Sequence, residues 1–156
     1  MGAVMFYHLT QRPLVDTLRM LVDKSLAAGW RVSVRGTERA GLEALDAALW
    51  MGPEDSFLPH GLEGGPQDVA QPVLLGLGEG NANNAQCVMV VHSAEVSVQD
   101  VEAMERVCIL FDGYDEEALG HARKQWKTLT AAGVSAQYWS EESGRWEKKA
   151  ETKANP

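Results

Sequence analysis

The stretch RVCILFD, residues 106–112, decides the fold of this 156-residue chain. Every residue between its first and its last is apolar, without the polar alternation that marks a strand exposed on one face. A continuous apolar run of this length is typical of a parallel strand that is buried on both faces of its sheet. Such sheets occur in α/β folds, whose helices cover both faces. We therefore expect an α/β fold with a largely parallel sheet.

Segments with strand and helix patterns alternate along the rest of the chain. Apolar runs predict strands at residues 4–9, 72–77 and 87–91, and alternation of apolar with other residues predicts strands at 30–35 and 134–138. Helical spacing and capping residues predict helices after Pro13, after Thr37 as a cap, after Ser97 in a capping box with Asp100, and over 115–132. The segment GEGNANNAQ, residues 78–86, is predicted as the turn of a hairpin. We expect a single domain over residues 1–140 and a polar, disordered tail over residues 141–156.

Composition and charge disfavour several classes of function. The chain is 45% hydrophobic, enough for a core of its own, and its net charge is −8. A protein this acidic repels the phosphates of nucleic acids and of anionic membranes, so direct binding of DNA is disfavoured. The apolar run at residues 87–91 is far too short to span a bilayer, and the N-terminus lacks the layout of a signal peptide. We expect a soluble cytoplasmic protein with two buried free thiols, Cys87 and Cys108.

The glycines of this chain do not form a recognised phosphate-binding loop. Open α/β sheets bind ligands at the carboxyl ends of their strands, but the segment HLTQRP that follows the first strand, residues 8–13, contains no glycine. The segment GLGEGNANN, residues 76–84, has the glycines for an anion-binding nest. No helix opens directly after it, and a turn also explains its composition. We therefore predict no nucleotide site and no cofactor.

Acidic residues that follow the predicted strand over 106–111 admit two interpretations. Asp112, Asp115, Glu116 and Glu117 stand where a strand ends and a helix begins, a place where a metal or acid–base site is often built. Carboxylates in the first turn of a helix also cap its free N–H groups, and this interpretation is favoured. The histidines form no paired metal-ligand spacing; they are His8, His60, His92 and His121. We predict no catalytic or metal-binding residue, with a small α/β nucleotide- or metal-binding enzyme that uses the Asp112 strand end as the alternative.

A basic cluster stands out in this acidic protein. The segment HARKQWK, residues 121–127, places Arg123, Lys124 and Lys127 around Trp126 on the last predicted helix. Arg123 and Lys127 are one helical turn apart and therefore share a face. Exposed helices often carry such charges for solubility alone. The aromatic neighbour favours a different hypothesis, a site for an acidic peptide with an apolar end.

The segment LWMGPEDSFLPH, residues 49–60, opens a long stretch without periodicity. Irregular loops of this length are uncommon in compact domains and are usually functional or mobile. This one carries two large aromatic residues, Trp50 and Phe57. They are either anchors for a partner protein or parts of the domain's own core.

Three segments together resemble the chi subunit of bacterial DNA polymerase III. They are MFYHL at residues 5–9, LDAALW leading into PEDSFLPH at 45–60, and FDGYDEEALGHARKQWKTLTAAG at 111–133. The similarity runs from Met5 to about Trp139 in the same order, and residues 48–60 are its most specific part. The resemblance implies a Rossmann-like three-layer fold without a nucleotide site. It also implies an adaptor and not an enzyme.

The resemblance further implies two partners. Chi proteins link the clamp-loader complex to single-stranded-DNA-binding protein by holding the acidic C-terminal tail of the latter, and another surface binds the psi subunit. On this family pattern the tail would bind at Arg123, Trp126 and Lys127, with Lys124 beside them. DNA would be reached only indirectly, and no membrane is involved.

The psi-contacting aromatic residues of the family fall on Trp50 and Phe57. They would be presented on a loop that Pro53 and Pro59 stiffen, which lowers the entropy cost of binding. An apolar residue that completes the tail pocket in relatives falls on Asp112, where this chain departs from the pattern. Because the psi-contacting aromatics of the family fall on Trp50 and Phe57, we expect the protein that occupies the Trp50 surface to be a psi-like subunit or another clamp-loader protein.

Overall fold

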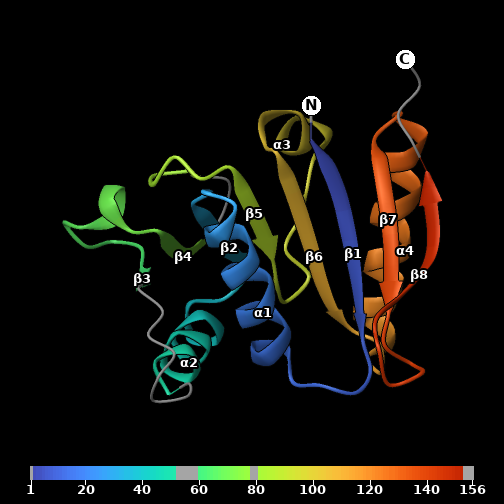
Figure 1. Cartoon of the computed structure of the whole chain (residues 1–156), viewed down its shortest axis with the longest axis horizontal. Helices are drawn as coiled ribbons and strands as arrows, with labels where there is room; N and C mark the ends of the chain where they lie inside the picture. Colours follow the sequence, from blue (N-terminus) through green and yellow to red (C-terminus); the bar gives the residue numbers. More distant parts are fainter. Residues whose placement is uncertain (1, 52–59, 78–80, 153–156) are drawn as a thin grey trace.

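The computed structural model describes residues 2–51, 60–77 and 81–152. They form a sheet of eight strands in the order β3-β4-β2-β5-β6-β1-β7-β8 (Figure 1). The strands are β1 Ala3–Leu9, β2 Val32–Gly36, β3 Gly61–Leu62, β4 Val73–Leu77, β5 Cys87–Val90, β6 Arg106–Asp112, β7 Ser135–Ser140 and β8 Glu147–Thr152; the helices are α1 Leu14–Ala27, α2 Arg39–Trp50, α3 Val98–Ala103 and α4 Glu116–Ala131, with a 3₁₀ turn at Asp68–Ala70. In the described part of the chain, every strand pair is parallel except β7 with β8.

Strand β6 lies near the middle of the sheet, and its side chains alternate between two cores. Cys108 and Leu110 pack in a core that includes residues of α1 and α2. Val107 and Ile109 pack on the other face in a core that includes residues of α3 and α4. Helices therefore cover both faces, so the predicted α/β fold with a largely parallel sheet, Rossmann-like as the resemblance implied, is confirmed. The two cysteines are free and buried, as expected.

Two local predictions in the first hundred residues were wrong. Strands β4 and β5 do not form a hairpin, because β2 lies between them and pairs with both in parallel. All three strands are rich in buried apolar residues, so they gain more by lying inside a parallel sheet than by folding back on one another. Thr37 does not cap α2. The residue at the N-cap is Glu38, while the hydroxyl of Thr37 donates to the carbonyl oxygen of His92 at 3.0 Å.

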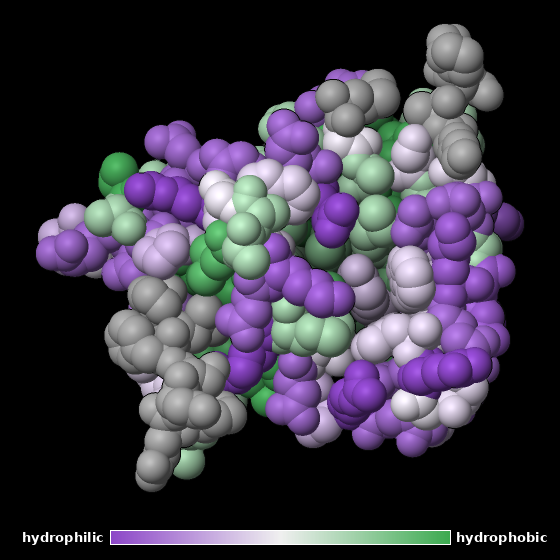
Figure 2. Space-filling model, in the orientation of Figure 1, coloured by the Kyte–Doolittle hydropathy of each residue, from purple (hydrophilic) through white to green (hydrophobic). Residues whose placement is uncertain are grey.

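The prediction of a disordered tail over residues 141–156 was also wrong for residues 147–152, within the part of the chain that the structure describes. Residues 147–152 form β8, which pairs antiparallel with β7 at the edge of the sheet. The indole of Trp146 packs edge-on against Tyr7, with ring centroids 5.4 Å apart, and so ties this segment to the core. Figure 2 has the orientation of Figure 1, and hydrophilic residues predominate along its right-hand side, where Figure 1 shows β7 and β8. An edge strand tolerates a polar sequence because much of its surface faces water, which explains why hydrophobic periodicity did not reveal it.

The carboxylate of Glu141, at the turn between β7 and β8, binds the loop that follows β1. Its Oε1 atom accepts hydrogen bonds from the backbone N–H groups of Thr10, Gln11 and Arg12 at 3.1, 2.9 and 2.9 Å. Burial opposes ionisation of this carboxyl group, but the three N–H donors and the nearby Arg12 guanidinium outweigh it and lower its pKa. In nucleotide-binding α/β proteins, backbone N–H groups at this place hold phosphate. Here an internal carboxylate takes their hydrogen bonds.

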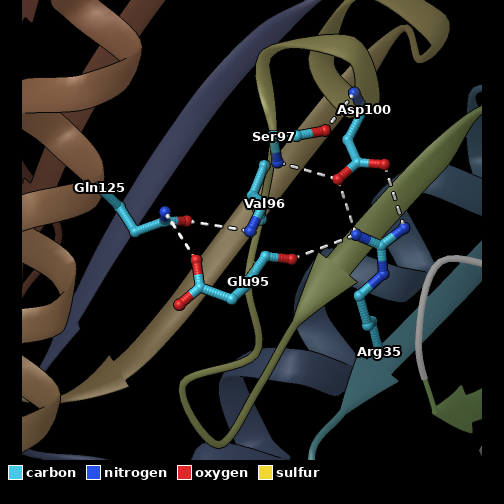
Figure 3. Close-up of polar contacts among 6 residues, drawn as sticks. All are labelled: Arg35, Glu95, Val96, Ser97, Asp100 and Gln125. Carbon is cyan, nitrogen blue, oxygen red and sulfur yellow. Dashed lines mark hydrogen bonds and ion pairs between the residues drawn. The ribbon is translucent and has the colours of Figure 1, made fainter.

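An ion pair between the buried Arg35 and the partly buried Asp100 joins β2 to the start of α3 (Figure 3). Nη1 and Nη2 of Arg35 donate to the two carboxylate oxygens of Asp100 at 2.9 and 3.4 Å, and Nη1 also donates to the carbonyl oxygen of Glu95 at 3.2 Å. Asp100 also completes a capping box with Ser97, as predicted. Burial opposes ionisation of Asp100, but the bonds from Arg35 and Ser97 outweigh it and lower its pKa. One carboxylate thus both caps α3 and holds Arg35.

Helix α4 is attached to the same segment through Gln125. Its side-chain oxygen accepts from the backbone N–H of Val96 at 3.1 Å, and its side-chain nitrogen donates to a carboxylate oxygen of Glu95 at 3.4 Å (Figure 3). Gln125 is buried, so these bonds set the rotation of α4 about its axis. With Gln125 turned inward, Arg123 and Lys127 are exposed.

We expect Asp100→Ala to lower the free energy of unfolding by about 3 kcal/mol, because it leaves the Arg35 guanidinium buried without its carboxylate and removes the cap of α3. Urea denaturation followed by circular dichroism measures the change. The control Glu43→Ala removes a carboxylate from the exposed ion pair with Arg39 and should cost less than about 1 kcal/mol. Equal losses in the two variants would contradict the role given to the buried pair.

Stability should fall on acidification below about pH 4, the ordinary range of carboxyl groups. A carboxyl group whose folded-state pKa is lowered stabilises the fold fully above its unfolded-state pKa, and this contribution is lost as the pH falls through the folded-state value. Asp100 and Glu141 both behave in this way. In Glu141→Gln the stability at neutral pH should be lower and its decline in acid shallower, as urea denaturation over a pH series would show. Parallel pH profiles of wild type and variant would exclude this role for Glu141.

Candidate peptide-binding groove and second interaction surface

Helix α4 exposes the basic cluster found in the sequence. Its inner face packs on the sheet through the buried residues Ala118, Ala122, Gln125 and Leu129. Arg123, Lys124 and Lys127 are exposed, and Trp126 is half-buried between them and the core. The helix therefore holds three cationic groups around one aromatic ring.

These residues line a groove of about 740 Å³ between α4 and the β7–β8 edge of the sheet. Its walls are formed by Arg123, Lys124, Trp126 and Lys127 of α4, Tyr138 of β7 and Ala150 of β8. Figure 1 shows α4, β7 and β8 together at one end of the sheet. The structure thus brings together all four residues predicted for this site and adds two.

The aromatic wall of the groove is held by the core. The ring of Trp126 meets Phe6 edge-on at 5.3 Å between centroids and meets Tyr138 edge-on at 6.0 Å. The Tyr138 hydroxyl lies 2.9 Å from Nδ1 of His8, within hydrogen-bonding distance. Burial raises the pKa of Tyr138, while the Arg123 guanidinium opposes the shift. Contacts on several sides therefore position the two rings before any ligand binds.

The cations of the groove are available to a ligand. Among the residues that the structure describes, the ion pairs within 4.0 Å involve other groups, and none includes Arg123, Lys124 or Lys127. Arginine binds carboxylates through a planar fork, and lysine binds them as a point charge. Three such groups beside two aromatic rings can bind a peptide that carries carboxylates and an apolar side chain.

The two added residues differ in how far the sequence could have revealed them. Tyr138 lies in a strand whose alternation with Val134 and Ala136 was visible, and that alternation places it on the α4 face. Ala150 lies in a segment expected to be disordered, and no sequence signal indicated it. Asp112, which the family pattern aligned with an apolar pocket residue, does not line this groove. It lines a different cavity, and its Oδ1 atom accepts from the backbone N–H of Tyr114 at 2.9 Å.

That second cavity, of about 750 Å³, lies at the carboxyl ends of the strands, where an enzyme of this fold class would bind a ligand. The backbone donors in the loop after β1 are bound to Glu141, as described above. Asp115 caps α4 by accepting from the N–H groups of Glu117 and Ala118, so the capping interpretation is confirmed for this residue. Among the described residues, no three His, Cys, Asp or Glu side chains are grouped to hold a metal ion.

A second surface surrounds Trp50 at the end of α2. The indole is 50% exposed and lies against the imidazole of His60, with ring centroids 4.2 Å apart. His60 is buried, and its Nε2 atom lies 3.2 Å from the carbonyl oxygen and 3.2 Å from a carboxylate oxygen of Asp46. Met51, the next residue, is 84% exposed. Phe57, predicted to act together with Trp50, lies outside the described residues.

No helix in the described ranges is long and apolar enough to cross a membrane.

Comparison with known proteins gives a consistent result over most of the chain. The family profile described as DNA polymerase III chi subunit, HolC, matches residues 1–137. The DNA polymerase III subunit chi of Escherichia coli (strain K12) is 29% identical over 138 residues, which cover 83% of this chain and 92% of that protein. The probable DNA polymerase III subunit chi of Rickettsia prowazekii (strain Madrid E) is 22% identical over 111 residues, covering 68% of this chain and 67% of that protein. The chain belongs to the DNA polymerase III chi subunit family.

Proposed function

We propose that this protein is a non-enzymatic adaptor of the DNA polymerase III clamp-loader complex that holds the acidic C-terminal tail of single-stranded-DNA-binding protein. The observation that carries the proposal is the groove on α4, where three exposed cations surround the ring of Trp126. The net charge of the chain is −8, so a cationic groove is an exception on an acidic molecule. It attracts an acidic peptide while the rest of the protein repels DNA. Contact with DNA is then made through the partner.

The groove suits a tail that ends in an apolar residue. Arg123 and Lys127 lie one turn apart on α4 and can pair with the carboxylates of the tail, including the terminal one. The rings of Trp126 and Tyr138 offer an apolar wall to a phenylalanine side chain. Charge brings the peptide to the groove, and burial of the ring keeps it there.

We expect Arg123→Ala and Lys127→Ala each to weaken binding of a short acidic peptide that ends in phenylalanine by about tenfold or more. Each variant removes a hydrogen bond to a charged group, which contributes roughly 1.5–3 kcal/mol. Fluorescence anisotropy of a labelled peptide measures the affinity. Added salt should weaken binding by the wild type, because it screens exposed charges.

The matched control is Lys24→Ala, which removes an exposed cation near the end of α1, remote from the groove. Its affinity should equal that of the wild type. Unchanged affinity in both groove variants would show that the peptide binds elsewhere. An equal loss in all three variants would mean that overall charge is responsible and not the groove.

We further propose that the Trp50 surface binds a psi-like subunit of the same complex. Trp50 is 50% exposed, and its indole packs against the buried imidazole of His60, which holds the ring in place. Large aromatic residues presented in this way often dominate the energetics of protein interfaces. The family pattern makes Phe57 the second anchor of this proposal.

Trp50→Ala should weaken binding of a psi-like subunit by about 30-fold or more, the effect of losing roughly 2 kcal/mol at an interface hot spot. Surface plasmon resonance with the immobilised subunit measures this affinity. The same variant should bind the acidic peptide as the wild type does. Val69→Ala, which truncates another exposed apolar residue, is the control and should change neither affinity. Loss of both affinities in Trp50→Ala would indicate damage to the fold instead of a contact.

A further inference from the structure

Strand β8 lies beyond the part of the chain that the family profile matches, yet it forms a wall of the groove. The match ends at residue 137, whereas β8 spans residues 147–152. In the β7–β8 pair, Ala150 lies opposite Tyr138, and both residues line the groove. This wall therefore belongs to a segment that the family profile does not cover.

A β-bulge decides which residue of β8 faces the groove. Near the turn, Trp139 pairs with Lys148, but one step further Tyr138 pairs with Ala150, so that Lys149 is the extra residue. A shift of one residue exchanges the two faces of a strand. If the register near the turn continued, Lys149 would lie opposite Tyr138. The bulge instead places a methyl group there.

Strand β8 is fixed in this register by side-chain contacts at both ends. Toward its end, Gln137 of β7 donates to a carboxylate oxygen of Glu151 at 2.7 Å, and the hydroxyl of Thr152 donates to the carbonyl oxygen of Val134 at 3.4 Å. Before its start, Trp146 packs on Tyr7 as described above. The wall is thus part of the folded domain.

We propose that β8 is part of the peptide-binding site and that Ala150 determines which apolar end the groove accepts. This inference rests on the proposed function of the groove. The cations of α4 bind the carboxylates of the acidic peptide, and the terminal side chain enters between Trp126, Tyr138 and Ala150. The methyl group of Ala150 leaves room for a phenylalanine ring. A large side chain at this position would occupy the same space, because protein interiors and sites are close-packed.

The test compares four proteins by anisotropy titration with the same labelled acidic peptide that ends in phenylalanine. Ala150→Trp should weaken binding by at least about tenfold, which corresponds to about 1.4 kcal/mol. Ala150→Ser, which keeps the groove open, should bind within about twofold of the wild type, a change of less than about 0.5 kcal/mol. Lys148→Trp places the same bulky residue on β8 opposite Trp139, on the other face of the strand, and should also bind like the wild type.

A double-mutant cycle separates a contact with the terminal phenylalanine from a general loss of binding. The second peptide has alanine in place of its terminal phenylalanine, and each protein is titrated with both. If Ala150 lies beside the phenylalanine, Ala150→Trp weakens binding of the first peptide far more than binding of the second. Equal effects on the two peptides, or wild-type affinity of Ala150→Trp for both, would overturn the role of Ala150 while leaving the groove as the site. A wild type that binds neither peptide would overturn the proposed function and this inference together.

Discussion

The burial of β6 on both faces is the constraint on which the rest of the structure depends. Its side chains alternate between two cores, so helices must cover both sides of the sheet to keep them from water. Helix α4 follows β6 directly and packs on the sheet through Ala118, Ala122 and Leu129. Because this face is turned inward, the polar face of α4 and its three cations must lie outside. The position of the groove is therefore a consequence of how the core is closed.

Two internal carboxylates then fix the parts that form the groove. Asp100 holds Arg35 and caps α3, and Gln125 joins α4 to the segment directly before that helix. Glu141 binds the loop after β1 and so anchors the turn that leads into β8. Buried charges of this kind are tolerated only when they are paired or hydrogen-bonded, as both carboxylates are here. The same three hydrogen bonds occupy the backbone donors at the place where a nucleotide-binding α/β protein would hold phosphate.

The predictions that held depend on local patterns, and those that failed depend on contacts between distant residues. The α/β class, the capping box at Ser97 and the basic face of α4 follow from periodicity and spacing over a few turns. The prediction of a hairpin between β4 and β5 was wrong because β2, some forty residues earlier than β4, pairs with both strands. The prediction of disorder was wrong for residues 147–152 because this polar segment is ordered by pairing with β7, and no local sequence pattern reports that pairing.

The candidate site shows the same division between sequence and tertiary structure. The sequence by itself determined that α4 would carry Arg123, Lys124, Trp126 and Lys127 together, because residues three and four apart share a helix face. Only the tertiary structure decided that this face meets Tyr138 and Ala150 to form a groove, and that Asp112 lies elsewhere. A helix face follows from the geometry of one segment. A groove needs the strand order and the register of β8, which are set by hydrogen bonds and packing between segments far apart in the chain.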